Sequence, residues 1–192
     1  MNVSDGHRKR VKHYDLPGEC HELTFSCHGR RPLLADDTRC GMLSVSMDRA
    51  IENHGYLLLA FVYMPMHVHL LVFPTREDCE VNRLLSAIKK PFSLRVKKLL
   101  EEQGSVLLDE LTVKDRPGKS VFRFWQAGPG YDRNVTTLPT LRKMAEYIHN
   151  NPVRKELCRT PDGWRWSSWR QIHEPDMPRD PDVPKVLWPD EI

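Results

Sequence analysis

Apolar positions along the chain switch between the two-residue period of strands and the longer period of helices. Residues 21–28 alternate well enough for a first strand. Two apolar runs, at 56–63 and 67–73, flank a Met-Pro-Met turn and predict an antiparallel pair of strands at the centre of a sheet. A last strand is expected at 121–125, where valine and aromatic residues follow a Pro-Gly loop.

Three segments have helical spacing of their apolar residues. The first covers residues 41–54, and the second covers 80–103. Pro91 should break or kink the second helix, because proline lacks an N–H group and clashes with the preceding turn. The third helix covers residues 138–151 and is expected to stop at Pro152.

This order of elements predicts one α+β domain. Strand, helix, strand, strand, helix, strand, helix fits an antiparallel sheet flanked by helices, as in ferredoxin-like or RRM-like folds. With 192 residues the chain can fill one core and is too short for two ordinary domains. We assign the domain to residues 19–173, between a flexible basic arm (residues 1–18) and a Pro-rich acidic tail (residues 174–192). The tail is expected to be extended and mobile.

Composition narrows the protein class. A hydrophobic fraction of 40% and a charged fraction of 29% are typical of a soluble globular protein. No apolar run reaches the roughly 20 residues of a membrane helix, and no apolar segment follows the basic N-terminus, so a cytoplasmic location is expected. The five cysteines form no C-x-x-C pair, which argues against zinc knuckles and a disulfide framework and favours buried thiols.

The net charge of +3 is unevenly divided. Residues 174–192 hold six acids and two bases, so residues 1–173 carry +7. A basic body suits a polyanionic partner. Residues 81–100 contain no acid and six basic residues, which either bind the phosphates of such a partner or form an ordinary solvated helix face: Arg83, Lys89, Lys90, Arg95, Lys97 and Lys98. The basic residues of the arm (Arg8, Lys9, Arg10 and Lys12) could grasp the same partner.

His67-Val68-His69 is the sharpest chemical feature. On a strand, His67 and His69 point to one face while Val68 points to the other. Two imidazoles at this spacing can bind one divalent ion, and burying them without a partner is costly. Taken alone, the pair is also compatible with two solvent-facing or hydrogen-bonded histidines.

The last predicted helix carries a second candidate cluster. Tyr147 lies at the edge of the apolar stripe, with Lys143 one turn before it and Asn151 one turn after it. Tyr147 can present its hydroxyl to a site, and Asn151 can offer its amide oxygen to the same ion. The alternative is a boundary tyrosine whose ring packs on the core.

Together, M-P-x-H-V-H and the later Y-I-x-x-N-P-V-R resemble the HUH single-tyrosine transposases, most closely the REP-associated tyrosine transposases of bacteria. The resemblance covers residues 14–169 and includes Trp125-Gln126, Tyr131-Asp132-Arg133 and Trp166-Ser167-Ser168. One position departs from the family, because Met66 stands where Asp or Asn is usual. We expect that change to affect the geometry of the turn before the histidines and the affinity for the metal.

The resemblance implies a role for each motif residue. Tyr147 would be the nucleophile on a C-terminal helix, and His67, His69 and Asn151 would bind Mg²⁺ or Mn²⁺ beside a central strand. Such enzymes cut and rejoin single-stranded DNA through a 5′-phosphotyrosine, here expected at palindromic hairpins. The metal or Lys143 would help the phenol to lose its proton. Besides the basic residues of 81–100, Lys143 and Arg154 are the expected DNA contacts.

Several alternatives remain open from the sequence. A DNA-binding regulator could keep the fold and lack catalysis, and a metallohydrolase could use the histidines on a small molecule. The acidic tail could occupy the basic groove and restrain the protein. The tryptophans near the end of the domain could stack on bases or, as we favour, pack in the core: Trp164, Trp166 and Trp169. Neither a monomer nor a homodimer is favoured.

Overall fold

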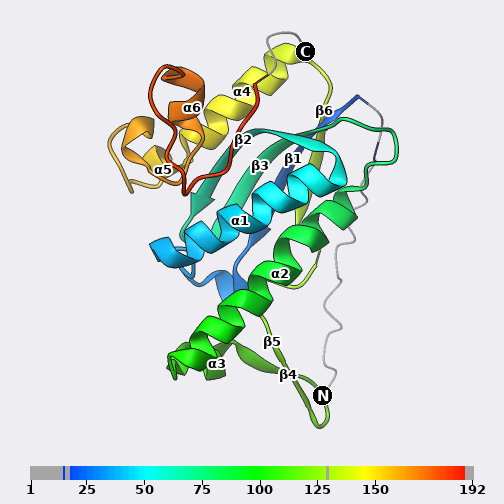
Figure 1. Ribbon diagram of the computed structural model, residues 1–192, viewed down its shortest axis with the longest axis vertical. Helices are drawn as coiled ribbons and strands as arrows, with labels where there is room; N and C mark the ends of the chain where they lie inside the picture. The colour runs from blue at the N-terminus through cyan, green and yellow to red at the C-terminus, as the bar shows by residue number, and fades with distance from the viewer. Residues whose placement is uncertain (1–14, 16–17, 129, 189–192) are drawn as a thin grey trace, which may run out of the picture.

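The computed structural model describes residues 15, 18–128 and 130–188. Its centre is an antiparallel four-stranded sheet in the order β2-β3-β1-β6 (Figure 1). The strands are β1 (Cys20–Ser26), β2 (Tyr56–Met64), β3 (His67–Pro74) and β6 (Tyr131–Val135). The predicted α+β architecture, with the His-x-His motif on a central strand, is therefore confirmed.

Helices cover both faces of this sheet. The helices α1 (Asp37–His54) and α2 (Val81–Glu102) lie side by side on one face, and α4 (Leu138–His149) lies against the other (Figure 1). Alternate residues of each strand supply the two cores. Val68, Leu70 and Val72 of β3 join the core under α1 and α2, whereas Leu71 joins the core under α4. The histidines at positions 67 and 69 therefore belong to the α4 face.

The predicted antiparallel pair is present, but its placement was partly wrong. β2 lies at the edge of the sheet, and β3 and β1 form its centre. The edge strand is nevertheless buried because the C-terminal segment covers it. The Tyr63 N–H donates to the Trp166 carbonyl at 2.8 Å, and the Ser168 N–H donates to the Phe61 carbonyl at 3.1 Å. Trp166 is itself buried, as core packing predicted.

The predicted last strand at 121–125 was wrong. β5 (Lys119–Phe122) pairs only with β4 (Thr112–Arg116), and this hairpin lies outside the main sheet. Trp125 touches the sheet through a single bridge to Cys27. The fourth strand is β6, whose polar sequence Tyr-Asp-Arg-Asn-Val hides its strand character because part of its surface stays open.

The helices agree with prediction except around two prolines. α2 runs through Pro91 without a break, because the buried side chains on both sides of the proline pack against the core. Pro152 does not end the last helix. α4 ends at His149, and Pro152 lies in the first turn of α5 (Asn151–Arg154). The remaining helical segments are η1 (His28–Arg30), α3 (Val106–Leu111), η2 (Pro161–Gly163) and α6 (Trp169–His173).

The described part of the C-terminal tail, residues 174–188, packs against the domain, contrary to the prediction of a mobile segment. Val183 is only 3% exposed, and the Leu187 N–H donates to the Leu58 carbonyl of β2 at 3.0 Å. Most of the predicted N-terminal arm lies outside the described residues. Four of the cysteines are buried thiols, namely Cys20, Cys27, Cys40 and Cys79. None of the described helices combines the length and the apolar character that a bilayer-spanning segment requires.

Candidate active site

His67 and His69 converge at the start of β3. Their Nε2 atoms lie 3.0 Å apart, and their rings meet nearly edge to face. In the neighbouring strand β1, Thr24 is the partner of His69 in the register. The Thr24 hydroxyl lies 2.8 Å from His69 Nδ1. In the tautomer whose Nδ1–H donates to that hydroxyl, the lone pair of His69 Nε2 faces the site.

Thr24 is fixed in turn by a close approach of the chain before β6. Gly130 has a φ of 90°, and a Cβ atom there would lie 2.2 Å from the Thr24 carbonyl oxygen. Only glycine allows the backbone to pass this close. Tyr131 follows directly, is the register partner of Thr24, and is 49% exposed. The β1–β6 half of this face is therefore open beside the histidines.

Asn151 enters the site from the other side. It begins α5 and is 5% exposed, with its side-chain Nδ2 position 3.3 Å from His69 Nε2. An amide can present either its oxygen or its nitrogen at that position. With the oxygen turned inward, two imidazole nitrogens and one carbonyl oxygen converge on one point.

These residues fit a divalent ion. Two imidazole nitrogens bound at about 2.1 Å and at a right angle would lie about 3.0 Å apart, which matches the observed separation. Among the residues that the structure describes, no group of three or more His, Cys, Asp and Glu side chains could hold a metal. A third protein ligand here would be of another kind, and the Asn151 amide is a donor type that suits Mg²⁺ and Mn²⁺.

Burial favours the neutral form of both imidazoles. Desolvation lowers the pKa of His67, and the charges of Lys155 and Arg30 lower it further. Desolvation and the neighbouring His67 lower the pKa of His69 to about 4. Neutral imidazoles have the free lone pairs that metal ligation needs.

Tyr147 stands at the rim of this cluster. It is 41% exposed on α4, and its ring lies perpendicular to that of His69 with 6.0 Å between the centroids. The guanidinium carbon of Arg154 lies 4.7 Å from the centre of the Tyr147 ring. Tyr147 and Asn151 lie one helical turn apart, although α4 ends between them. Lys143 is exposed one turn earlier on α4.

Sequence reasoning found the residues within each motif but missed their neighbours. Thr24 carries no motif of its own, and only the strand register brings it to His69. Arg30 and Lys155 come near His67 from separate segments. The unusual Met66 is exposed in the turn before β3. Its carbonyl accepts from the Cys27 N–H at 2.8 Å, so the backbone holds this turn and the side chain at position 66 is free to vary.

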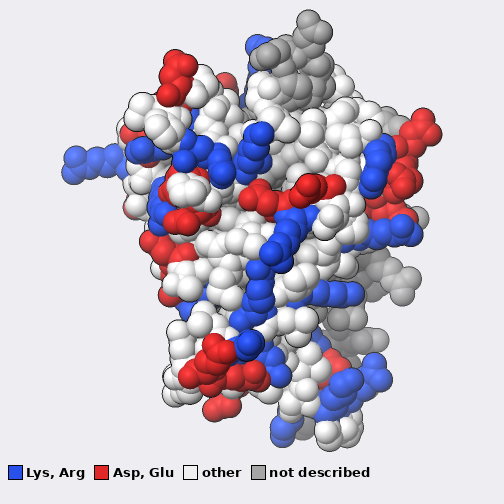
Figure 2. All heavy atoms as spheres, viewed as in Figure 1, with Lys and Arg blue, Asp and Glu red and all other residues white. Residues whose placement is uncertain are grey.

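The basic residues of 81–100 do not join the site. They lie on α2, across the sheet from the histidines and Tyr147, where Figure 2 shows lysine and arginine side chains interspersed with acidic groups. Three of these basic residues form ion pairs with acidic residues just outside 81–100: Arg83 with Glu80, Lys97 with Glu101, and Lys98 with Glu102. Arg95 binds the Met42 carbonyl and the Ser46 hydroxyl and thereby joins α2 to α1.

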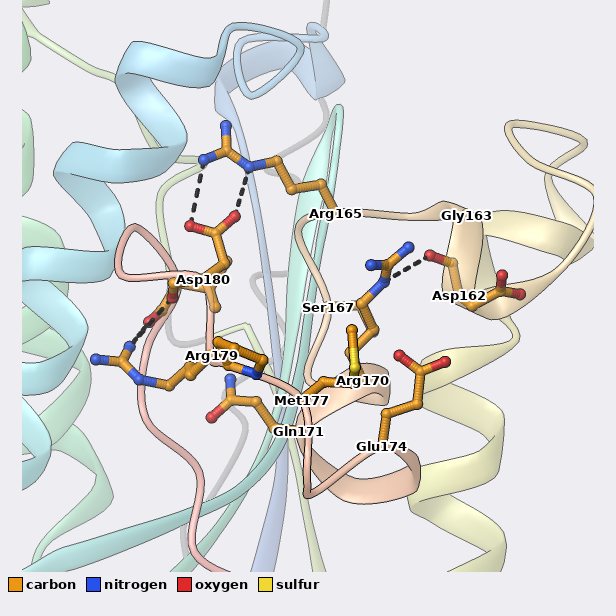
Figure 3. Close-up of a pocket in the computed structure, with 12 residues that line it drawn as sticks. Asp162, Gly163, Arg165, Ser167, Arg170, Gln171, Glu174, Met177, Arg179 and Asp180 are labelled. Carbon is orange, nitrogen blue, oxygen red and sulfur yellow. Dashed lines mark hydrogen bonds and ion pairs between the residues drawn. The ribbon is translucent and has the colours of Figure 1, made fainter.

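The tail carboxylates also have other partners. Asp180 and Asp182 pair with Arg165 at 2.7 Å and 2.6 Å, beside a cavity between the tail and the segment from η2 to α6 (Figure 3). None of the predicted site residues lines this cavity. Within the described part of the tail, Asp180 and Asp182 therefore pair with Arg165 and not with the basic residues of α2.

The fold resembles that of a solved transposase. The chain is similar to a REP-associated tyrosine transposase solved in complex with a REP hairpin, with a TM-score of 0.66 and 19% identity over 96% of this chain and 98% of that chain. A candidate transposase from Deinococcus radiodurans R1 gives a TM-score of 0.44 and 20% identity over 74% of this chain and 96% of that chain. The sequence matches no protein-family model and no curated protein. The first likeness shows that the chain has the REP-associated transposase fold, as the motifs predicted.

Proposed function

We propose that this protein is a metal-dependent, single-tyrosine transposase that cuts and rejoins single-stranded DNA. One observation carries the proposal: β3, α4 and α5 bring His67, His69, Asn151 and Tyr147 to a single point on one face of the sheet. These residues come from motifs about 80 positions apart in the sequence. Their meeting within a transposase fold is expected of this chemistry and has no evident role in packing alone.

His67, His69 and Asn151 would hold a Mg²⁺ or Mn²⁺ ion. Bound there, such an ion would polarise the scissile phosphate and offset the charge that develops on its oxygens. The Thr24 hydroxyl would hold the ring of His69 in place through its contact with Nδ1. The hydrophobic core behind β3 holds the strand, and hence both rings, in place.

Tyr147 would be the nucleophile. Its hydroxyl oxygen attacks the phosphorus of a phosphodiester, forming an O–P bond while the bond to the 3′ oxygen breaks. The phenol loses a proton, the departing 3′ oxygen gains one, and Lys143 is a candidate for assisting this transfer. The products are a 5′-phosphotyrosine and a free 3′-hydroxyl. Because one ester replaces another, the reverse attack by a 3′-hydroxyl rejoins DNA without ATP.

Positive groups around Tyr147 and His67 would position the DNA backbone. Arg154 lies over the Tyr147 ring, and the charges of Arg30 and Lys155 reach His67. Cations that meet phosphates make the affinity fall as salt rises. The similar transposase was solved bound to a REP hairpin, which supports a hairpin-forming DNA end as the substrate here.

The test mixes the purified protein with Mn²⁺ or Mg²⁺ and labelled single-stranded DNA from palindromes that flank its gene. Denaturing electrophoresis then detects DNA attached to protein. We expect an adduct that needs the ion, disappears in Tyr147→Phe, and persists in the matched control Tyr131→Phe. Tyr131 is also an exposed tyrosine on this face, so its hydroxyl tests whether any nearby phenol suffices.

Other outcomes separate the alternatives. DNA that binds tightly but never becomes covalent, with either ion and several palindromes, would favour the DNA-binding regulator. Hydrolysis that survives Tyr147→Phe would favour a metallohydrolase. Either result would contradict the proposed role of Tyr147.

A further inference from the structure

A second cavity lies across the sheet from Tyr147, between α2 and the chain that leaves β5. Its volume is about 570 Å³. The side facing solvent carries Leu94, which is 69% exposed, and the inner wall includes Phe122 and Trp125. An exposed apolar wall of this kind is unusual on a protein surface unless something covers it. Of the aromatic rings that line it, Phe122 is partly exposed, whereas Phe124 and Trp125 are buried.

The rim of this cavity is basic. Lys89, Lys90, Lys97 and Arg123 line it, and no acidic residue does. Lys97 and Arg123 have acidic partners, Glu101 and Asp115. The ammonium of Lys89 instead lies 4.7 Å from the centre of the Phe25 ring and has no carboxylate partner among the described residues. Burial lowers the pKa of Lys89 to about 8, which shows the cost of holding this charge without an anion.

The inner wall holds a second unsatisfied donor. Trp125 is 8% exposed, and its indole Nε1–H finds no acceptor in the part of the chain that the structure describes. Buried donors are normally paired. The Trp125 N–H is itself buried and does not face the open cavity, so it adds no contact for a ligand. The Lys89 ammonium beside an apolar and aromatic wall suits a ligand with negative charge and a flat ring.

The cavity and the candidate active site lie at the same end of the sheet. Trp125 bridges to Cys27, which follows Ser26, the register partner of His67. The Gln126 N–H donates to the Ser26 carbonyl at 2.8 Å. Phe124 and Trp125 therefore line the cavity, while the backbone of Trp125 and Gln126 is bound beside the strand end next to the histidines. One DNA strand passing around this segment could reach both places.

We propose that this cavity is a nucleotide subsite that takes one unpaired base of the DNA substrate. The base would stack on the aromatic wall, and its phosphate would meet Lys89 and Lys90. The inference rests on the proposed function, because it assumes a DNA substrate that passes the active site. Base–aromatic stacking is tolerant of sequence, so the subsite would hold the strand and would not read it.

The test measures binding alone, in the Tyr147→Phe protein, so that cleavage does not interfere. The probe is a hairpin with a short unpaired flank that carries 2-aminopurine, compared with the same hairpin lacking the flank. Lys89→Met keeps a long apolar side chain over Phe25 and removes the charge. The matched control is Lys114→Met, an exposed lysine on β4 that does not line the cavity.

We expect Lys89→Met to weaken binding of the flanked hairpin about tenfold and to lower the salt slope by about one. Lys114→Met should leave both nearly unchanged. Phe122→Ala should weaken binding roughly 5- to 150-fold, the range expected for loss of one stacked base, and Phe122→Trp should retain it. The 2-aminopurine fluorescence should be quenched on binding and should recover in Phe122→Ala.

The inference is overturned if Lys89→Met and Lys114→Met behave alike, or if the hairpin without a flank binds as tightly and loses as much affinity in the variants. Competition by an acidic peptide as effective as the unpaired flank would also overturn it, in favour of a protein partner.

Two outcomes separate the subsite from the proposed function. An adduct on Tyr147, together with a DNA affinity that Lys89→Met leaves unchanged, would refute the subsite and leave the proposed function standing. Weakened binding without any adduct would support the subsite and refute the catalytic proposal. Should Lys89→Met fold poorly, the Phe122→Ala and Phe122→Trp pair decides the question.

Discussion

Thr24 contacts the ring of His69 through a single hydroxyl group. Its oxygen lies 2.8 Å from His69 Nδ1, and the Thr24 backbone lies so close to Gly130 that a Cβ atom there would clash with the Thr24 carbonyl. Partners of this kind hold an imidazole in the orientation and tautomer that a metal needs. The orientation of His69 therefore depends on a residue of another strand.

We predict that Thr24→Val weakens Mn²⁺ binding by about 10- to 100-fold, the usual effect of losing a partner behind a ligating histidine. Valine keeps the shape of threonine and removes the hydroxyl. Isothermal titration of the protein with Mn²⁺ measures this directly, and Thr24→Ser should bind nearly as well as the unmodified protein. Equal Mn²⁺ affinity in Thr24→Val would show that the hydroxyl does not orient the ring.

Residues of the site were predictable to different degrees. His67 and His69 share a face because strand side chains alternate, and Tyr147 and Asn151 share a side because helical residues four apart are neighbours. Both relations are local, so the sequence reveals them. Thr24 is 45 residues from His69, and its role follows only from the strand register. No local pattern encodes that register.

Among the secondary-structure elements, α2 departs most clearly from what its sequence suggests. Proline in a helix interior removes a hydrogen bond and clashes with the preceding turn, yet α2 continues through Pro91 to Glu102. Ile88, Phe92 and Val96 are fully buried on one side of it. Burial of these side chains stabilises the helix enough to outweigh the local penalty.

We predict that Pro91→Ala stabilises the protein by about 1–3 kcal/mol, because alanine restores the missing N–H and has the highest helix propensity. Pro91 is exposed, so the change leaves the core intact. Urea denaturation followed by circular dichroism gives the free energy of unfolding. A loss of stability would mean that proline sets a bend which the packing of α2 on α1 requires.

Strand character in the sequence does not coincide with the strands of the main sheet. The run 121–125 has strong strand character, but it divides between β5 and a single bridge at Trp125. The segment 131–135 is polar and still completes the sheet, because β1 offers it a free edge. Strand propensity reports burial as much as backbone preference, so a half-open edge strand is hard to recognise.

On the scale of the whole molecule, the sheet separates two kinds of surface. The face under α4 carries the histidines, Asn151 and Tyr147, whereas the α2 side carries most of the predicted DNA-binding lysines and arginines. Composition predicted a basic body but gave no information on this division. The tail, expected to be mobile, is part of the folded domain and covers the edge of β2.

We predict that deleting residues 174–192 destabilises the protein and leaves its DNA affinity no higher. The deletion removes buried Val183 and the Leu187–Leu58 backbone hydrogen bond. A loss of about 2–3 kcal/mol, which is typical for one buried apolar side chain and its surroundings, would lower Tm by roughly 5–10 °C. Thermal unfolding and DNA titration test both parts. An unchanged Tm with tighter DNA binding would instead restore the idea of a restraining tail.

The central claim is that Tyr147 becomes covalently joined to DNA, and peptide mapping of the adduct tests it most directly. After reaction with single-stranded hairpin DNA and Mn²⁺, digestion with nuclease and trypsin releases a peptide spanning residues 144–154, in which Tyr147 is the sole tyrosine. Mass spectrometry should find a nucleotide attached to Tyr147 through its 5′ phosphate. A nucleotide on any other peptide, or none while DNA is bound, would contradict the account.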